Sequence, residues 1–176
     1  MNKQGYILDI IVFVIMAFVI IMFFGLYYYG HGLIKDKLVG IEMQIGTGET
    51  NFTDIVSTTI VPVHEGLNLL KTLTFVLIFG MVITIFLSNF LVRVHPAFFI
   101  LYLFVIISAV ILSAYISNSY ETFLVGDYVF SATLQEFTAT NFIMLNLPIW
   151  TTIVGLFGTF FLMAGILRDN ELGGPI

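Results

Sequence analysis

Three histidines are the side chains in this sequence best suited to bind a metal or a haem. A haem held between membrane helices needs imidazoles that project inward from within long apolar segments. His31, His64 and His95 all lie outside such segments, so we expect no haem bound by this chain alone. His64 and Glu65 could join His31 in a metal site, but adjacent residues of a helix point apart and no third ligand is indicated. We therefore expect solvated histidines near a membrane surface, with no metal and no cofactor.

The carboxylates give no indication of catalysis or ion conduction. A proton relay or an ion path usually places Asp, Glu, Lys or His inside a membrane span, where the desolvation is tolerated only for function. The nearest such residue is Asp9, at the edge of the first apolar segment, and we interpret it as interfacial. Cysteine, nucleophile motifs and glycine-rich phosphate loops are absent from the sequence. We therefore expect a protein that is not an enzyme.

Small residues spaced four apart recur in three apolar segments. Residues at this spacing line one face of a helix, and small side chains there let membrane helices approach closely. Hydroxyl groups in such segments commonly bond to the preceding helical turn or to a neighbouring helix. We predict that three rows pack against one another, namely Gly80, Thr84 and Ser88, then Ala109, Ser113 and Ser117, then Thr151, Gly155 and Thr159.

Four apolar segments carry these positions, and each is long enough to cross a bilayer. Each holds about twenty residues, which at about 1.5 Å per residue matches a hydrocarbon core about 30 Å thick. They cover residues 10–29, 72–92, 97–119 and 147–167. We therefore predict an all-α integral membrane protein in which residues 1–176 form a single membrane domain.

The composition supports this class and excludes others. Of the 176 residues, 59% are hydrophobic and 10% are charged, which leaves no room for a separate soluble domain. The six Lys and Arg residues are too few and too scattered to bind a nucleic-acid backbone. The first apolar run, which ends at Tyr29, is longer than the apolar part of a cleaved signal peptide, so we expect it to remain as an anchor.

The connections predict an antiparallel bundle. Arg93-Val94-His95-Pro96 permits only a sharp turn, because proline restricts the residue before it, so we expect the second and third helices to be neighbours. The three small-residue rows place the second, third and fourth helices in a packed core. The first segment is bulky, with only Ala17 and Gly25 as small residues, and we expect it to be peripheral, against lipid or a partner.

Two long connections, residues 30–71 and 120–146, are predicted on the membrane face opposite the termini. In the second connection, Phe130, Leu134 and Phe137 share one side. That spacing fits a short amphipathic helix in the interface or on a partner, and equally fits a loop packed on the bundle.

Two helix starts are predicted outside the spans. The apolar spacing from Pro62 onward indicates that the second helix begins about two turns before the membrane. Asn146 can cap the fourth helix, with Pro148 in its first turn.

Charge favours an interior position for both termini. Lysine and arginine are tied at three on each face. Acidic residues break the tie, because the face with the long connections carries a net charge of −5 and the face with the termini has a net charge of zero. We therefore predict that both termini are cytoplasmic, or in the equivalent interior compartment.

Three functional classes remain. We favour a non-catalytic structural or accessory subunit of a larger membrane assembly, such as a lipid-containing virion or an energy-converting complex, and no residue distinguishes these two. This class explains the uncharged spans and the apolar residues of the long connections, which a monomer would leave in water. The second class is a pore-forming or lesion-forming, holin-like protein, although no segment has a continuous polar stripe. The third is an inert subunit of a multi-subunit membrane enzyme. The expected partners are membrane lipid and other membrane-protein subunits, not nucleic acid, and we expect no cofactor apart from lipid that can bind.

Overall fold

The computed structural model describes residues 5–39, 52–91 and 96–171, and these residues form helices joined by short connections. At a few positions inside these ranges, including Ser88, only the backbone is described. The long helices follow the apolar segments, because a helix satisfies its backbone hydrogen bonds within one segment. In chain order the elements are α1 (Gly5–Val39), α2 (Phe52–Ile55), the π-helical η1 (Val56–Ile60), α3 (Val61–Gly66), α4 (Leu69–Leu91), α5 (Pro96–Val125), α6 (Ser131–Gln135), α7 (Thr138–Leu145) and α8 (Leu147–Glu171).

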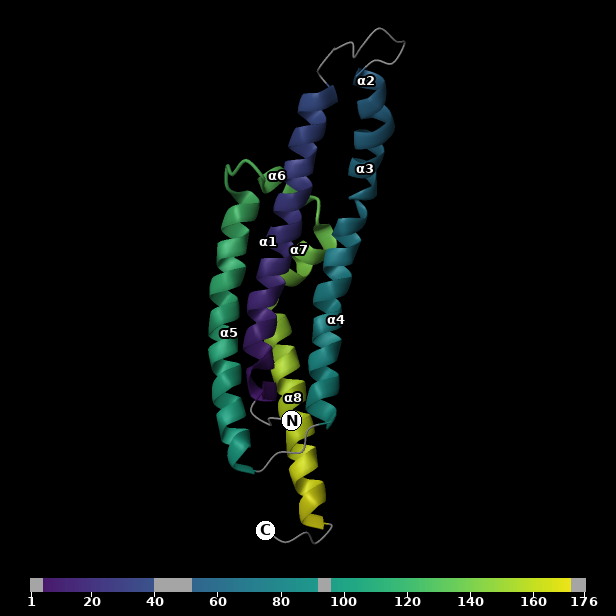
Figure 1. The fold of residues 1–176 in the computed structure, drawn as a ribbon. Coiled ribbons are helices and arrows are strands. Elements are labelled where there is room, and N and C mark those ends of the chain that lie inside the picture. The colour runs from purple at the N-terminus through teal and green to yellow at the C-terminus, as the bar shows by residue number, and fades with distance from the viewer. Residues whose placement is uncertain (1–4, 40–51, 92–95, 172–176) are drawn as a thin grey trace.

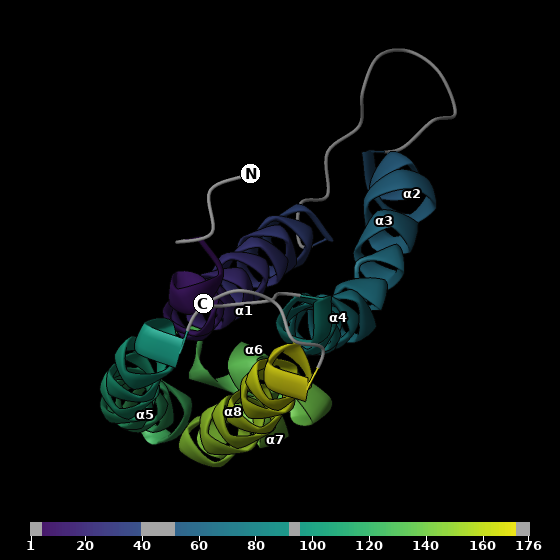
Figure 2. The ribbon, with the colours of Figure 1, turned by 90° about the horizontal axis from the view of Figure 1, so that it is seen from below.

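Four long helices, α1, α4, α5 and α8, lie side by side, and successive ones run in opposite directions (Figure 1). Seen from below, α4 and α5 lie on opposite sides, with α1 and α8 between them (Figure 2). The most extensive contact joins α5 to α8, and α1 packs against both α5 and α4. The core is therefore shared by all four long helices.

Three of the helical stretches are long and apolar enough to cross a membrane, namely Leu8–Val39, Val56–Ile85 and Phe99–Val125. The bent pair Thr138–Leu145 and Leu147–Phe161, with 68° between the two helices, makes a fourth if it is counted as one span. For the described residues, the prediction of an all-helical chain with several segments long and apolar enough to cross a membrane is confirmed.

Helix α1 is not peripheral, and this corrects the prediction drawn from its bulky side chains. Ile10, Phe13, Val14, Ala17 and Ile21 are completely buried. They follow the three- and four-residue spacing of a single helix face. Packing between membrane helices depends on fit as well as on small residues, so a stripe of large side chains also forms a helix interface.

The turn between α4 and α5 does not make these helices packed neighbours. Within the described ranges, each of them contacts α1 and α8 extensively, whereas no comparable contact joins α4 to α5. The predicted pairing is therefore wrong, and residues 92–95 of the turn itself lie outside the described residues. A short connection holds two helix ends close together but leaves the rest of each helix free to pack elsewhere.

The connection after the first apolar segment is largely helical where the structure describes it. Helix α1 continues past Tyr29 to Val39, and α2, η1 and α3 precede α4. Only a short turn at Leu67 and Asn68 separates α3 from α4. The last part of α1 and the α2–η1–α3 stretch extend past the upper end of α5 (Figure 1). We call these two stretches, residues 30–39 and 52–66, the helical arm.

The second connection packs against the long helices. Leu134 of α6 and Phe137 after it are buried, as are Ile143 and Met144 of α7. The structure combines features of the two alternatives left open by the sequence. The segment forms short helices, and their apolar sides pack on the bundle. Asn146 does not cap α8 with its side chain, because its amide donates to the carbonyl of Phe142 at 2.9 Å.

Candidate functional site

The small-residue rows of α5 and α8 are largely buried, and Gly155 of α8 faces α5. Ala109, Ser113 and Ser117 are buried on α5. Thr151 and Gly155 are buried on α8, and Thr159 is partly buried. A Cβ atom added to Gly155 would lie 2.8 Å from a methyl carbon of Ile106, so this glycine permits the close approach of α5.

The structure does not bring the α4 row to the other two. A Cβ atom added to Gly80 would meet no atom within 4 Å. Thr84 is exposed and donates to the carbonyl of Gly80 at 2.8 Å, and the side chain of Ser88 lies outside the described residues. The buried face of α4 instead carries larger residues, including Ile78 and Val82. Four-residue spacing identifies a helix face but does not say whether it turns inward.

A buried hydrogen-bond network holds the break before α7. The hydroxyl of Tyr120 on α5 donates to Oδ1 of Asn141 on α7. The amide of Asn141 donates to the carbonyl of Leu134 at 2.9 Å, and the amide of Gln135 donates to the carbonyl of Leu124 at 3.0 Å. Irregular backbone at membrane depth is tolerated only where such groups satisfy it. Sequence reasoning missed this network, because both residues lie in the second long connection, where the spacing predicted only an apolar side.

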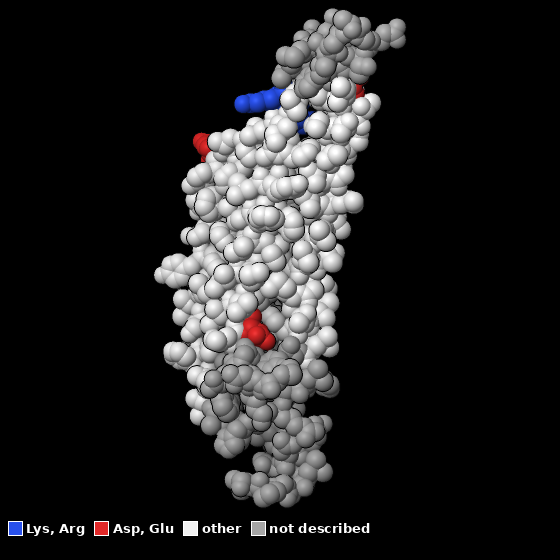
Figure 3. Space-filling model, in the orientation of Figure 1, with Lys and Arg blue, Asp and Glu red and all other residues white. Residues whose placement is uncertain are grey.

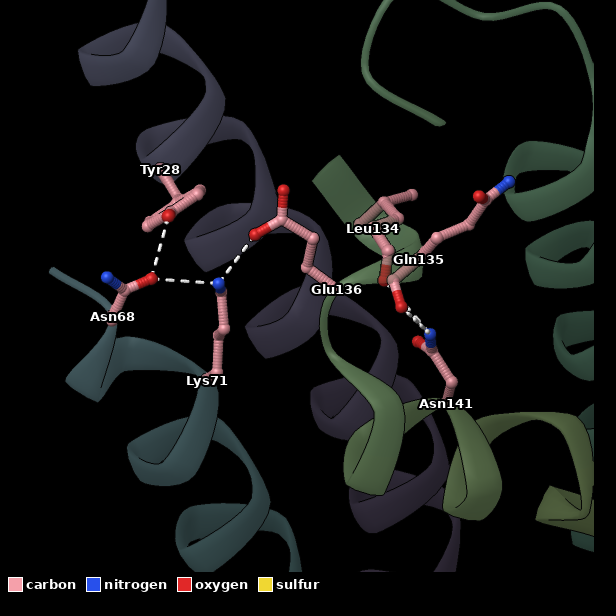
Figure 4. A network of polar contacts seen from close by, with 7 residues as sticks. All are labelled: Tyr28, Asn68, Lys71, Leu134, Gln135, Glu136 and Asn141. Atoms are coloured by element: carbon pink, nitrogen blue, oxygen red, sulfur yellow. Dashed lines mark hydrogen bonds and ion pairs between the residues drawn. The ribbon is translucent and has the colours of Figure 1, made fainter. Parts of the chain in front are cut away.

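A second polar cluster lies where α1, α3, α4 and the segment after α6 meet, and Figure 4 shows its centre. Tyr28 on α1 donates to Oδ1 of Asn68 at 2.8 Å, and Lys71 on α4 donates to the same oxygen at 2.8 Å. Lys71 also forms an ion pair with Glu136 at 2.5 Å, and its Nζ lies 4.7 Å from the centre of the Tyr28 ring. We call Tyr28, His31, His64, Asn68, Lys71 and Glu136 the polar junction.

The two histidines of the polar junction contact each other. His31 Nδ1 of α1 lies 3.3 Å from His64 Nδ1 of α3. The ring of His64 also lies beside that of Tyr28, with 4.9 Å between the ring centres. The sequence predicted separate, solvated histidines here. Their proximity could not be inferred from their positions 33 residues apart, since only the pairing of α1 with α3 brings them together.

A cavity of about 240 Å³ opens beside the polar junction. Its lining includes Tyr28 and Lys35 from α1, His64 from α3 and Glu136. In the part of the chain that the structure describes, no group of three or more His, Cys, Asp or Glu side chains could hold a metal ion.

The polar junction joins segments that are far apart in the sequence. Tyr28 and Asn68 are 40 residues apart, and Lys71 and Glu136 are 65 residues apart. These bonds connect the base of the helical arm and the α6–α7 segment to the long helices. The arrangement is suited to holding segments in place, and its lysine and glutamate already bond to each other.

Comparison with known proteins leaves the chain without an assigned family. A scan against protein-family models, a search of curated proteins and a search of solved structures each found no match to this chain.

Proposed function

We propose that this protein is a non-catalytic structural or accessory subunit of a larger membrane assembly. It crosses the membrane with residues 10–29, 72–92, 97–119 and 147–167, and both termini are cytoplasmic or on the equivalent interior side. Its partners are membrane lipid and other membrane-protein subunits, in an assembly such as a lipid-containing virion or an energy-converting complex.

The surface of the long helices supports the membrane part of this proposal. In the view of Figure 3, no charged side chain lies between the charged groups near the upper end and an acidic group lower down. Exposed side chains of the four long helices include Phe23, Ile83, Ile107 and Phe160, one from each helix. Lipid tails are the solvent that such a surface requires.

The main observation in favour of binding to other subunits is the apolar surface of the helical arm. Leu33 and Ile34 on α1, and Ile55 and Val63 in the α2–η1–α3 stretch, are all at least 40% exposed. They lie beyond the ion pair of the polar junction along their helices, and residues 30–39 alone extend α1 by about 15 Å. In the proposed topology these side chains lie outside the hydrocarbon core, where water would contact them unless a partner covers them.

The arm offers a direct test of the assembly role. We expect mild-detergent extraction from the native membrane, followed by native mass spectrometry, to give a complex that contains other subunits besides this 19.8 kDa chain. Ile34→Glu and Val63→Glu should release those subunits, because a carboxylate would be buried against the partner. Thr59→Glu is the matched control, since it adds the same charge at an exposed polar position of the same arm.

Three results would contradict the proposal or a part of it. A monomer or a homo-oligomer in the native extract would remove the larger assembly. Ion conductance of the purified protein in planar bilayers would favour the holin-like alternative instead. Retention of all subunits by the two glutamate variants would show that the arm is not the surface that binds them.

A further inference from the structure

The contact between His31 and His64 has the geometry of a shared proton. The two Nδ1 atoms are 3.3 Å apart, the ring centres are 5.4 Å apart, and the ring planes differ by 12°. The ring centres are 2.1 Å farther apart than the two nitrogens. This difference is about twice the distance from a ring nitrogen to the centre of its own ring. The nitrogens therefore lie on the line between the centres, and each points at the other.

The separation of the two nitrogens falls within the range of a hydrogen bond between the rings. One N–H that donates to the lone pair of the other ring suits the separation. Such a bond forms when both rings are neutral and also when one ring is charged.

Protonation of both rings removes the bond. Each Nδ1 then carries a hydrogen, neither has a lone pair to accept, and two positive charges face each other across 3.3 Å. The charged and titratable groups around the pair are of both signs. They are Tyr28, Tyr29, Lys35 and Asp36 from α1, Lys71 from α4 and Glu136 from the segment after α6, with Glu65 next to His64 in α3 itself.

The histidine pair is one of the contacts that hold this half of the helical arm against α1. Helix α3 has no buried residue, and His64 contacts His31, Tyr28 and the backbone near Gly32, whereas η1 buries one residue, Val56. A turn at Leu67 and Asn68 separates α3 from α4. A segment that buries so little apolar surface opens at a small cost in free energy.

We propose that His31 and His64 form a pH-sensitive latch between α1 and α3, closed while at most one of the two rings is protonated and open when both are. Because the second proton meets a charge already present, protonation of both rings requires a lower pH than protonation of one, so the latch opens as the pH falls. Opening releases the α2–η1–α3 half of the helical arm. The inference rests on the geometry of the pair and does not require the assembly role proposed above.

Distance measurement between two spin labels tests the latch in the full chain. The sequence contains no cysteine, so Ile34→Cys on α1 and Val63→Cys on α3 give two unique labelling sites at exposed positions. In lipid nanodiscs, we expect the label separation to increase as the pH is lowered from about 7.5 to about 4.5, a range that brackets the ordinary histidine pKa. The same chain with His64→Gln, which hydrogen bonds but does not titrate, should show no change with pH.

A pair of charge variants distinguishes a titrating latch from a passive contact. Lys35→Gln removes a positive neighbour and should move the midpoint of opening to higher pH, whereas Asp36→Asn removes a negative neighbour and should move it to lower pH. A label separation in the parent chain that stays constant over the whole range would overturn the proposal. So would a His64→Gln chain that opens as the parent does, because another group would then be responsible.

Discussion

Hydroxyl groups in the long helices are satisfied mainly within their own helix. Thr74, Thr84 and Thr159 each donate to the carbonyl four residues earlier, at 2.6 to 2.9 Å. Ser117 differs, because it donates to the carbonyl of Leu145 on α7 at 2.9 Å and so connects two helices. A polar residue in such a helix is therefore no indication of a conducting path, since the preceding turn already provides its partner.

Gly155 is a residue at which the packing of α5 against α8 leaves little room. Gly155→Leu should lower the stability of the folded chain by about 1–3 kcal/mol, because the new side chain would have to displace Ile106 or move α5 away from α8. Thermal unfolding of the purified protein in detergent would measure this loss.

Gly80 provides the matched control for this substitution. Gly80→Leu places the same side chain on a helix of similar length where a Cβ atom meets nothing within 4 Å, so the unfolding midpoint of the isolated chain should be almost unchanged. Equal midpoints for Gly155→Leu and the parent chain would contradict the close α5–α8 packing.

At the scale of the elements, the break at α6 and α7 distinguishes this fold from four simple hairpin-connected helices. Helix α7 meets α8 at 68°, and Asn141 of α7 bonds to Tyr120 on α5 and to the carbonyl of Leu134. One amide side chain thus satisfies groups on two other segments. The short helices depend on this side chain more than on their own length, since helices of fewer than about a dozen residues are marginal alone.

Asn141→Leu should loosen the α6–α7 segment. The substitution leaves the Tyr120 hydroxyl without its partner, and an unsatisfied buried group costs about 1–3 kcal/mol. It also removes one of the two hydrogen bonds to the Leu134 carbonyl, which keeps the bond from the backbone N–H of Phe137. Hydrogen exchange should become faster in α6 and α7, while the middle of α5 keeps its protection. Asn146→Leu is the matched control, because that amide makes an exposed hydrogen bond to the carbonyl of Phe142 in the adjoining α7. Equal exchange in the two variants would show that the Asn141 network does not hold this segment.

At the scale of the whole molecule, α1 and α8 begin or end toward the same end of the structure (Figure 1). The opposite end carries the helical arm and the polar junction. An even number of crossings accounts for this arrangement if the bent α7–α8 pair counts as one span. The charge of −5 on the face with the long connections is the basis for placing that face outside.

The orientation in the membrane can be measured directly. A reporter fused after Ile176 should be active in the cytoplasm, and external protease should leave it intact. A reporter inserted at Thr47, between the two glycines of the first long connection, should be active outside and serves as the reciprocal control. Clipping of the C-terminal reporter from outside would reverse the proposed topology.

Hydropathy predicts the positions of the long helices well, because apolar length is a property of a continuous segment and requires no knowledge of its neighbours. Hydropathy did not predict that α1 continues past Tyr29 to Val39, because Lys35, Asp36 and Lys37 interrupt the apolar run. The polar junction was not predicted from the sequence for a different reason. Its members are ordinary interfacial residues until α1, α3 and α4 bring them within hydrogen-bonding distance.

The sequence alone determined that this chain is helical, with segments able to cross a membrane, since twenty apolar residues in a row have few other stable forms. Only the tertiary structure decided which face of each helix packs. On α1 both faces are apolar, yet Phe13 is buried and Phe23 is 63% exposed. Lipid solvates apolar side chains as well as a protein core does, so hydrophobicity cannot distinguish the two faces, and the shapes of the facing helices choose between them.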